Sequence, residues 1–540
     1  MTNGVWRVPT PVNEPVLSYA PGTPERAALL AEAARQSAEI VQIPCVVGGR
    51  EVFTGNIWEL RNPSAHREVL AHVHLAGDAE IEAAMLAAND AKHAWSLMPF
   101  EERAAIFLRA ATLLAGPWRA RVNAATLLGQ GKTAHQAEID SACELIDFWR
   151  FNVHYAEQIL RDQPPISGPG TWNRTDHRPL DGFVFAVSPF NFTAIALNLP
   201  TAPALVGNTV VWKPATTSAL ACHHLFRMLR DAGLPDGVIN LLHGHGPEVG
   251  ARVLPNQDLG GIHFTGSTRT FHAMWRTVGE HIGGYRQYPR LVGETGGKDF
   301  IVAHQSADAA QVATAIVRGA FEYQGQKCSA ASRMYIPSNL WPEVRDRVVA
   351  DMAAIRQGDP RDLSNFVGPV IDRAAYDRVG SYIDLAHAEA TVLAGGTYDA
   401  NEGWYVAPTL AQVSTPKHRL MREEIFGPVA SVWVYEPDSW DELLTIVDRT
   451  SPYALTGAVF ARDRAVLAVA QQALRHAAGN FYINDKPSGA VVGQQPFGGG
   501  RASGTNDKAG SPLNLLRWIS PRTLKETFDP PTDWRYPFLG

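Results

Sequence analysis

Cysteine is scarce in this chain, and several other features are missing altogether. Four cysteines in 540 residues are too few for a disulfide framework, and they show no paired spacing, which favours free thiols in a reducing cytosol. No apolar stretch reaches the roughly 18 residues that a membrane helix needs, and the first residues lack the basic head and apolar core of a secretory signal. We therefore expect a soluble, cytoplasmic protein with no membrane partner.

The sequence also lacks the features of nucleic-acid-binding and zinc proteins. Its formal charge is −6, from 48 basic and 54 acidic residues, and no block of lysine and arginine offers a stripe for phosphates. The 18 histidines include no His-Glu-x-x-His sequence and no Cys/His spacing typical of zinc. His223 and His224, adjacent in an expected helix, are interpreted as surface residues. We expect no nucleic-acid partner and no metal.

Beyond residue 181, short apolar strands alternate with helices. This rhythm is typical of a mostly parallel sheet covered on both faces, so the fold class is α/β, and 540 residues are enough for two or three domains. The expected strands are 182–187, 209–212, 237–242 and 261–264. The expected helices are 27–38, 79–98, 101–115, 138–159, 218–232, 247–253 and 267–279. A second alternating block, from residue 300 to about 481, predicts a second α/β domain with the site at the junction.

Two segments break this rhythm. Residues 166–181 are rich in glycine, proline and polar residues, and residues 517–528 alternate apolar and polar side chains near the C-terminus. Both are expected to form strands of a small flap or subunit contact.

Cys328 has the surroundings of a reactive thiol. Small and polar residues flank it, with an expected helix before them and an expected strand after them, so it is placed in a loop. A buried structural thiol is the alternative reading, as for most lone cysteines. Lys327 is expected to help lower the pKa of the thiol. Cys143 and Cys222 lie within expected helices and are interpreted as packing residues.

Two further residues complete a possible reaction centre. Glu294 lies in a glycine-rich turn between two apolar strands, and Asn191 follows the strand 182–187. Each has an ordinary alternative, as a surface carboxylate and as a turn residue. A thiol nucleophile, a carboxylate base and an amide donor together indicate acyl chemistry at an aldehyde or activated carbonyl.

The signals for a nucleotide cofactor are incomplete. Residues 244–250 space their glycines as G-x-G-x-x-x-G, one residue away from the usual dinucleotide fingerprint. Residues 264–268 end one strand and open a helix whose backbone N–H groups can face a phosphate. Lys213, at the end of an apolar strand, is placed to reach a ribose or phosphate.

With these segments in view, the chain resembles the aldehyde dehydrogenases. The segments that carry the resemblance occur in family order: Pro189-Phe-Asn-Phe192, Trp212-Lys-Pro214, Phe264-Thr-Gly-Ser267, Gly293-Glu-Thr-Gly-Gly-Lys298, Gly325-Gln-Lys-Cys328 and Glu424-Ile-Phe-Gly-Pro428. The resemblance implies the aldehyde dehydrogenase fold: a Rossmann-like NAD-binding domain, an α/β catalytic domain and a small β oligomerisation flap. The implied divisions are 1–165 with 182–292 (NAD binding), 293–484 (catalytic), 166–181 with 515–530 (flap) and 485–514 (substrate-anchor loop and return).

The resemblance also implies roles by position. Cys328 would be the nucleophile and Glu294 the general base, while Asn191 and the Cys328 backbone N–H would hold the oxyanion. NAD is the implied cofactor, and Glu424 would hold its nicotinamide ribose. The other implied cofactor-binding residues are Ser188, Lys213, Gly266, Ser267, Thr268, Arg269 and Thr270.

Within the family, the chain is most similar to the branch that oxidises L-glutamate γ-semialdehyde. Four segments carry this similarity: residues 200–203, 321–329, 482–486 and 491–499. It implies NAD-dependent oxidation of that aldehyde, in equilibrium with 1-pyrroline-5-carboxylate, to L-glutamate in the second step of proline catabolism. The implied substrate contacts are Phe192, Ser329, Gly489, Ala490 and Phe497. Some relatives have serine where this chain has Ala490, which leaves backbone donation alone at that position.

Several alternatives remain at this stage. Oxidation of another semialdehyde, such as succinic, is the main rival, and a cofactor-free cysteine hydrolase and a silent binding protein are others. Lys213 is followed by Pro-Ala-Thr-Thr with no acid to repel a 2′-phosphate, so some use of NADP is expected beside NAD. A homodimer or higher homo-oligomer, with possible contact to a proline dehydrogenase, is the expected assembly.

Overall fold

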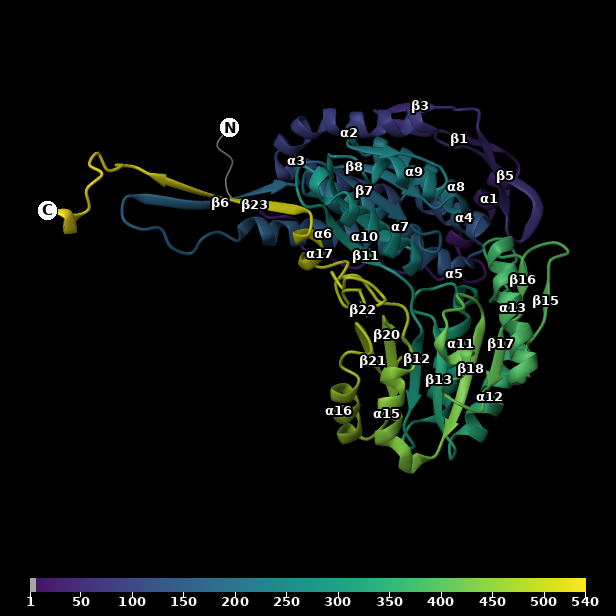
Figure 1. Ribbon diagram of the computed structural model, residues 1–540. Coiled ribbons are helices and arrows are strands. Elements are labelled where there is room, and N and C mark those ends of the chain that lie inside the picture. The colour runs from purple at the N-terminus through teal and green to yellow at the C-terminus, as the bar shows by residue number, and fades with distance from the viewer. Residues whose placement is uncertain (1–5) are drawn as a thin grey trace.

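The computed structural model describes residues 6–540 and contains two seven-stranded sheets, each covered by helices (Figure 1). The first sheet has the order β11-β10-β7-β8-β9-β2-β3, in which the strands from β11 to β9 are parallel and β2 and β3 form an antiparallel edge. Its strands are β2 (Cys45–Val47), β3 (Arg50–Val52), β7 (Phe183–Ser188), β8 (Thr209–Pro214), β9 (Ile239–Leu241), β10 (Leu259–Thr265) and β11 (Arg290–Glu294).

Alternating side chains of these strands supply two cores, one on each face. On β7, Val184 and Ala186 pack into one core, whereas Phe183 and Phe185 pack into the other. This alternation follows from the two-residue period of a strand. Helices α3 (Phe100–Ala115), α6 (Glu144–Arg161), α7 (Thr193–Leu205) and α8 (Ala219–Asp231) cover the first face, and α2 (Asp78–Leu97), α9 (Gly246–Val253) and α10 (Thr268–Glu280) cover the second.

A smaller sheet and two further helices lie beside this layer at the N-terminal side. The sheet has the order β1-β5-β4 and packs with the helices around one more core. Its strands are β1 (Val41–Ile43), β4 (Ile57–Asn62) and β5 (Ala65–His74), and the helices are α1 (Pro24–Ser37) and α4 (Arg119–Gln130).

The second large sheet has the order β14-β17-β18-β13-β12-β20-β21, parallel except at β14. Its strands are β12 (Asp299–Ala303), β13 (Ala331–Pro337), β14 (Thr391–Ala394), β17 (Thr409–Gln412), β18 (Val429–Tyr435), β20 (Thr456–Phe460) and β21 (Asn480–Ile483). Helices α11 (Ala309–Phe321) and α12 (Trp341–Ala354) cover one face, and α13 (Arg373–Glu389), α15 (Trp440–Arg449) and α16 (Arg464–Ala473) cover the other.

Short elements complete the connections. The short strands are β15 (Tyr398–Asp399), β16 (Tyr405–Val406), β19 (Tyr453–Ala454) and β22 (Gly500–Arg501), and the short α-helices are α5 (Ala134–Ala137), α14 (Arg419–Arg422) and α17 (Pro512–Leu516). Single 3-10 turns occur at η2 (Thr216–Ser218), η3 (Ile282–Gly284), η4 (Glu322–Gly325), η5 (Pro437–Ser439) and η6 (Pro537–Leu539).

The two segments that break the rhythm form one antiparallel ribbon. Strand β6 (Thr171–Pro179) pairs with β23 (Ile519–Thr527) over nine residue pairs, from Thr171 with Thr527 to Pro179 with Ile519. Figure 1 shows this ribbon projecting away from both large sheets. The expectation that both segments are strands is therefore confirmed.

The structure corrects two expectations about helices. The segment expected to be one helix, 138–159, consists of a π-helical segment, η1 (Glu138–Cys143), followed by α6. The short helix α5 directly precedes η1. His223 and His224 are buried rather than on the surface, because α8 packs both against the core, and burial lowers their pKa to about 4 and about 3.

Among residues 6–540, no helix is long and apolar enough to cross a membrane, and no group of three or more His, Cys, Asp or Glu side chains is arranged to hold a metal ion.

Candidate active site

Cys328 and Glu294 meet where the two large sheets join. The Cys328 Sγ donates a hydrogen bond to Glu294 Oε1 at 3.3 Å. Glu294 is the last residue of β11, and Cys328 lies in the turn between η4 and β13. The chain enters this turn through left-handed backbone at residues 323–325, and a Cβ on Gly325 would lie 2.3 Å from the Gly427 carbonyl oxygen. Glycine at 325 therefore allows the close approach that places the thiol.

Burial controls the protonation of both groups. It raises the pKa of Glu294 to about 7, against the opposing effects of the Cys328 hydrogen bond and the Lys508 charge. Burial and the Glu294 charge raise the pKa of the Cys328 thiol well above its usual range. The expectation that Lys327 helps to lower the thiol pKa stays a prediction, since burial and Glu294 dominate the shift. The Lys327 ammonium is paired with Asp140 and Glu322, at 3.7 and 3.6 Å.

Asn191 lies in the loop between β7 and α7, directly beside the cysteine turn. Its Nδ2 donates to the Gln326 carbonyl oxygen at 3.0 Å, two residues before Cys328, and its side chain is buried. An amide has two N–H groups, so this bond fixes the side chain and leaves a second donor. The structure thus brings together the three residues that the sequence analysis singled out for chemistry.

A chamber of about 410 Å³ opens above Cys328. Cys328 and all five residues expected to contact the substrate line it: Phe192, Ser329, Gly489, Ala490 and Phe497. Gly489 and Ala490 belong to the segment 486–495, here called the anchor loop. Gly489 has a positive φ of 89°, a backbone conformation that favours glycine. A chamber of this size is in the range of small-molecule sites.

One wall of the chamber is acidic, and the sequence analysis missed it. Asp140, Glu144 and Asp147 line it from η1 and α6. Burial, together with the Asp140 charge, raises the pKa of Glu144 well above its usual range, against the opposing effect of Lys132. The i, i+4, i+7 spacing of these acids was the available signal, since residues so spaced share one side of a helix.

The buried Lys132 links this wall to the aromatic side of the chamber. Its Nζ donates to Asp140 at 2.5 Å and lies 4.4 Å from the centre of the Phe192 ring. A cation at this distance over an aromatic face attracts the ring. Lys132 therefore helps to hold Phe192 in the chamber wall.

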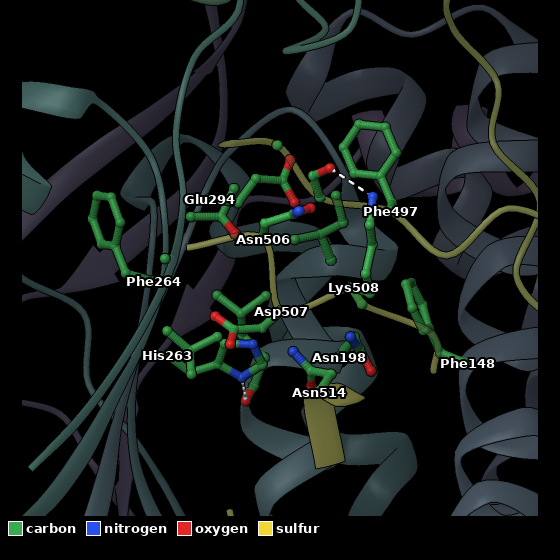
Figure 2. A pocket seen from close by; sticks show the side chains of 18 of the residues that line it. Phe148, Asn198, His263, Phe264, Glu294, Phe497, Asn506, Asp507, Lys508 and Asn514 are labelled. Atoms are coloured by element: carbon green, nitrogen blue, oxygen red, sulfur yellow. Dashed lines mark hydrogen bonds between the residues drawn. The ribbon is translucent and has the colours of Figure 1, made fainter. Parts of the chain in front are cut away.

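A second, smaller cavity lies behind Glu294 (Figure 2). It shares Glu144, Phe148 and Phe497 with the chamber above Cys328. Lys508 reaches into it and donates to the carbonyl oxygens of Gly479 and Gly498, at 2.8 and 3.0 Å. Burial lowers the pKa of Lys508, and Glu294 opposes that shift. Lys508 thus provides a cation that acts on Glu294 from this second cavity.

The residues expected to hold a dinucleotide gather at one edge of the first sheet. Ser188 and Lys213 lie at the carboxyl ends of the neighbouring strands β7 and β8, and Gly266 follows β10. The sheet order reverses between β7 and β10, and α/β ligands bind at such switch points. The Lys213 side chain is buried, which lowers its pKa to about 8.

The N-terminus of α10 contributes backbone donors to this edge. Ser267 caps the helix by accepting a hydrogen bond from the Thr270 N–H at 3.2 Å, and Thr268 Oγ1 donates to the Tyr453 hydroxyl at 3.4 Å. A Cβ at position 266 would lie 2.7 Å from the Phe264 ring, so glycine keeps this turn compact. Arg269 and Thr270 are exposed.

Glu424 reaches the same edge from the second sheet's side. Its Oε1 accepts a hydrogen bond from the Gly297 N–H at 3.1 Å, and a Cβ on Gly296 would lie 1.9 Å from that oxygen. A fixed carboxylate, a helix N-terminus and a lysine around a switch point fit a dinucleotide with its ribose hydroxyls and phosphates.

Comparison with known proteins agrees with this geometry. The model of the aldehyde dehydrogenase family matches residues 54–523. This chain belongs to the aldehyde dehydrogenase family. It is 50% identical over 536 residues to delta-1-pyrroline-5-carboxylate dehydrogenase, mitochondrial, of Dictyostelium discoideum, covering 98% of this chain and 96% of that one. The human protein of the same name is 47% identical over 530 residues, covering 98% and 94%.

Solved structures of this family give the same result. Delta-pyrroline-5-carboxylate dehydrogenase from Mycobacterium tuberculosis, in a structure bound with NAD, has a TM-score of 0.96 and 53% identity over 100% of both chains. Proline utilization A (PutA) from Bdellovibrio bacteriovorus has a TM-score of 0.91 and 31% identity, covering 97% of this chain and 54% of that one. The predicted family and fold class are therefore confirmed.

Proposed function

We propose that this aldehyde dehydrogenase oxidises L-glutamate γ-semialdehyde, in equilibrium with 1-pyrroline-5-carboxylate, to L-glutamate with NAD as hydride acceptor. The observation that carries the proposal is the hydrogen bond between Cys328 and the part-buried Glu294, with Cys328 in a chamber that the anchor loop also lines. Relatives at about 50% identity over nearly the whole chain bear the name of this activity.

The first half of the proposed reaction forms a thioester. Glu294 accepts the Cys328 proton along their 3.3 Å hydrogen bond, and the thiolate attacks the aldehyde carbon. Asn191 and the Cys328 backbone N–H stabilise the oxyanion of the resulting thiohemiacetal. Bound NAD⁺ supplies the acceptor for the hydride that leaves this carbon, and a thioester on Cys328 remains.

The second half releases the acid. Glu294 first releases to solvent the proton that it took from Cys328. It then removes a proton from water, and the resulting hydroxide attacks the thioester carbonyl carbon. The carbon–sulfur bond then breaks to give L-glutamate and the free thiolate. A carboxylate with a pKa of about 7 suits this task, because it is a stronger base than an ordinary carboxylate and about half of it is ionised at neutral pH.

The chamber explains the choice of substrate in this proposal. The N–H groups of Gly489 and Ala490 and the Ser329 hydroxyl are assigned to the substrate carboxylate. Phe192 and Phe497 enclose the methylene groups. The acidic wall is assigned to the substrate ammonium. Asp147, whose pKa burial raises to about 6, supplies a negative charge at neutral pH, and Glu144, whose pKa is raised well above its usual range, supplies a hydrogen-bond acceptor.

The cofactor site is assigned in the same proposal. When NAD is bound, Lys213 would reach a ribose or phosphate, Glu424 would hold the nicotinamide ribose, and the turn before α10 would face a phosphate or the nicotinamide end. Because no acid follows Lys213 closely, we also propose some use of NADP. Comparing kcat/KM for NAD and NADP tests this point, and a clear preference for NADP would contradict it. The assigned cofactor residues are Ser188, Lys213, Gly266, Ser267, Thr268, Arg269, Thr270 and Glu424.

The assembly and location also belong to the proposal. We assign residues 1–165 and 182–292 to NAD binding and 293–484 to catalysis. Residues 485–514 are assigned to the anchor loop and the return of the chain to the NAD-binding domain. We assign the ribbon of β6 and β23 to contact between copies of the chain. The exposed Trp172 and Phe528, 53% and 64% accessible, support that contact because association would cover them. Contact with a proline dehydrogenase and a cytoplasmic location remain proposals; several relatives are named mitochondrial.

One assay tests the function directly. NADH formation is measured with 1-pyrroline-5-carboxylate for wild type, Cys328→Ala and Cys222→Ala. We expect activity in wild type and in Cys222→Ala, whose thiol lies in the core, and none in Cys328→Ala. A panel that includes succinic semialdehyde separates the main rival, because that aldehyde lacks the α-amino group. A higher kcat/KM for succinic semialdehyde would overturn the proposal.

A further inference from the structure

An N-terminal arm, residues 6–20, forms part of the wall of the substrate chamber. Asn13, Glu14 and Val16 line the chamber together with the anchor loop. The arm has no helix or strand of its own, and more than 470 residues of sequence separate Asn13 from the anchor loop. Its position is therefore set by contacts with other elements.

Three buried carboxylates hold the arm by its backbone. The N–H groups of Val8, Glu14 and Leu17 donate to Glu157, Asp147 and Glu138 at 3.0, 2.7 and 2.9 Å. These three acids come from η1 and α6, the segment that also supplies the acidic wall. Hydrogen bonds to ionised acceptors are the stronger kind, so the arm follows this segment closely.

Asn13 connects the arm to both sides of the chamber. Its Nδ2 donates to Asp147 Oδ2 and to the Val492 carbonyl oxygen, both at 2.8 Å. Its Oδ1 accepts from Gln494 Nε2 at 3.0 Å. Both amide protons and the amide oxygen are thus used, and the bonds join the arm, α6 and the anchor loop at one side chain.

The anchor loop is packed tightly where Asn13 holds it. The Val491 N–H donates to the Gln495 side chain at 2.9 Å, which closes the loop tip on itself. Gly493 has a φ of 84°, and a Cβ there would lie 2.2 Å from the Phe151 ring of α6. Val492 itself is buried. The anchor loop is therefore packed tightly against α6. The hydrogen bond from Asn13 holds the loop at Val492, which is two residues beyond Ala490.

We propose that Asn13 is a positioning residue for substrate binding, which holds the backbone N–H groups of Gly489 and Ala490 toward the substrate carboxylate. This inference rests on the proposed function, since it takes the anchor loop to be the carboxylate site. Asn13 touches no reacting atom. Its loss weakens binding of carboxylate-bearing ligands and leaves the chemistry at Cys328 intact.

A purely structural role for Asn13 predicts a different pattern. If the arm only stabilised the fold, its weakening would affect every aldehyde equally. If Asn13 positions the carboxylate site, a short aldehyde without a carboxylate, such as propanal, is unaffected. The comparison of the two substrates in one variant therefore separates the two roles.

The experiment uses the full chain in three variants: Asn13→Ala, Asn13→Asp and the control Val12→Ala. Val12 neighbours Asn13 on the arm, but its side chain is 69% exposed and it does not line the chamber. Asn13→Asp keeps the shape of the side chain but removes both donated hydrogen bonds, so that a carboxylate faces Asp147 and the Val492 carbonyl oxygen, which repel it. For each protein, KM and kcat are measured with 1-pyrroline-5-carboxylate and with propanal, and the dissociation constant is measured for L-glutamate.

We expect Asn13→Ala to raise KM for 1-pyrroline-5-carboxylate and the dissociation constant of L-glutamate by roughly 10-fold, as for the loss of one or two hydrogen bonds. Asn13→Asp should raise both further. For propanal, KM and kcat should stay within about twofold in both variants, as should all values for Val12→Ala. Equal changes for both aldehydes, or no change for either, would overturn the proposal.

Hydrogen exchange of the anchor loop tests the same inference without turnover. The amides of residues 489–495 should exchange faster in Asn13→Ala than in wild type or Val12→Ala. Unchanged exchange would overturn the proposal that Asn13 holds the anchor loop in position. If the wild type oxidised propanal but not 1-pyrroline-5-carboxylate, the proposed function would fail instead. Exchange would still report on the contact between Asn13 and the loop.

Discussion

The two ends of the substrate chamber are built in different ways. At the reacting end, all three groups are placed by sheet strands: Glu294 is the last residue of β11, Asn191 follows β7, and Cys328 lies in the turn before β13. At the far end, the wall combines an N-terminal arm, a π-helical turn with its following helix, and the anchor loop near residue 490. Strand ends fix the chemistry rigidly, whereas selection of the substrate depends on contacts between segments that are distant in sequence. Changes at the reacting end should therefore lower kcat, and changes at the far end should act on KM.

The largest effect should come from the base. Glu294→Gln removes the proton acceptor of both the thiol and the hydrolytic water, and we expect turnover to fall by roughly 10²–10⁴-fold. Steady-state NADH formation measures this loss, and binding of L-glutamate should remain close to that of wild type. Turnover within tenfold of wild type would show that another group acts as the base.

The oxyanion donor should rank next. Asn191→Ala removes one donor to the developing charge, which typically costs about 2.7–4 kcal/mol of barrier, or roughly 100–1,000-fold in kcat. The same substitution also breaks the bond to the Gln326 carbonyl oxygen. Asn191→Asp, which keeps the shape and loses the donor, is the matched variant. If both variants changed only KM, this would contradict the claim that residues at the reacting end of the chamber control kcat.

The pH profile should show the titration of Glu294. The base acts when deprotonated, so kcat should be high above the Glu294 pKa of about 7 and fall by about 10-fold per pH unit well below it. Because the Lys508 charge lowers this pKa, Lys508→Met should move the acidic limb to higher pH. A limb that stays in place, or moves to lower pH, would argue against this coupling across the second cavity.

The smallest effect should appear at the far end. Ala490→Ser adds a hydroxyl beside the backbone N–H groups assigned to the carboxylate, and we expect KM for 1-pyrroline-5-carboxylate to fall by roughly 2–10-fold. The value of kcat should not change, and propanal should show no difference. An increase in KM would mean that the carboxylate binds elsewhere in the chamber.

The same contrast explains what the sequence could predict. Cys328, Glu294 and Asn191 are recognisable because each carries a local signal. Glu294 lies in a glycine-rich turn between apolar strands, small and polar residues flank Cys328, and Asn191 directly follows an apolar strand. The ribbon of β6 and β23 is recognisable because its two segments depart from the helix-to-strand rhythm. Asn13 carries no local signal, since its partners Asp147 and Val492 lie 134 and 479 residues away.

Two features of the structure were not predicted correctly from the sequence, and the causes are related. The acidic wall was missed because the i, i+4, i+7 spacing of Asp140, Glu144 and Asp147 marks one side of a helix but does not show that this side faces the anchor loop, which is distant in sequence. His223 and His224 were interpreted as exposed because histidine is polar, although α8 is packed between other helices and the sheet. Tertiary packing decided both cases, and no short window of sequence contains it.

The most direct test of the central claim is to identify the covalent intermediate. The wild-type protein is quenched with acid during turnover of 1-pyrroline-5-carboxylate and NAD, and its peptides are analysed by mass spectrometry. We predict that the peptide containing Cys328 carries the mass of a glutamyl thioester, and that Cys143, which also lines the chamber, carries none. Sustained turnover with no added mass on Cys328, or with the adduct on another residue, would contradict the account.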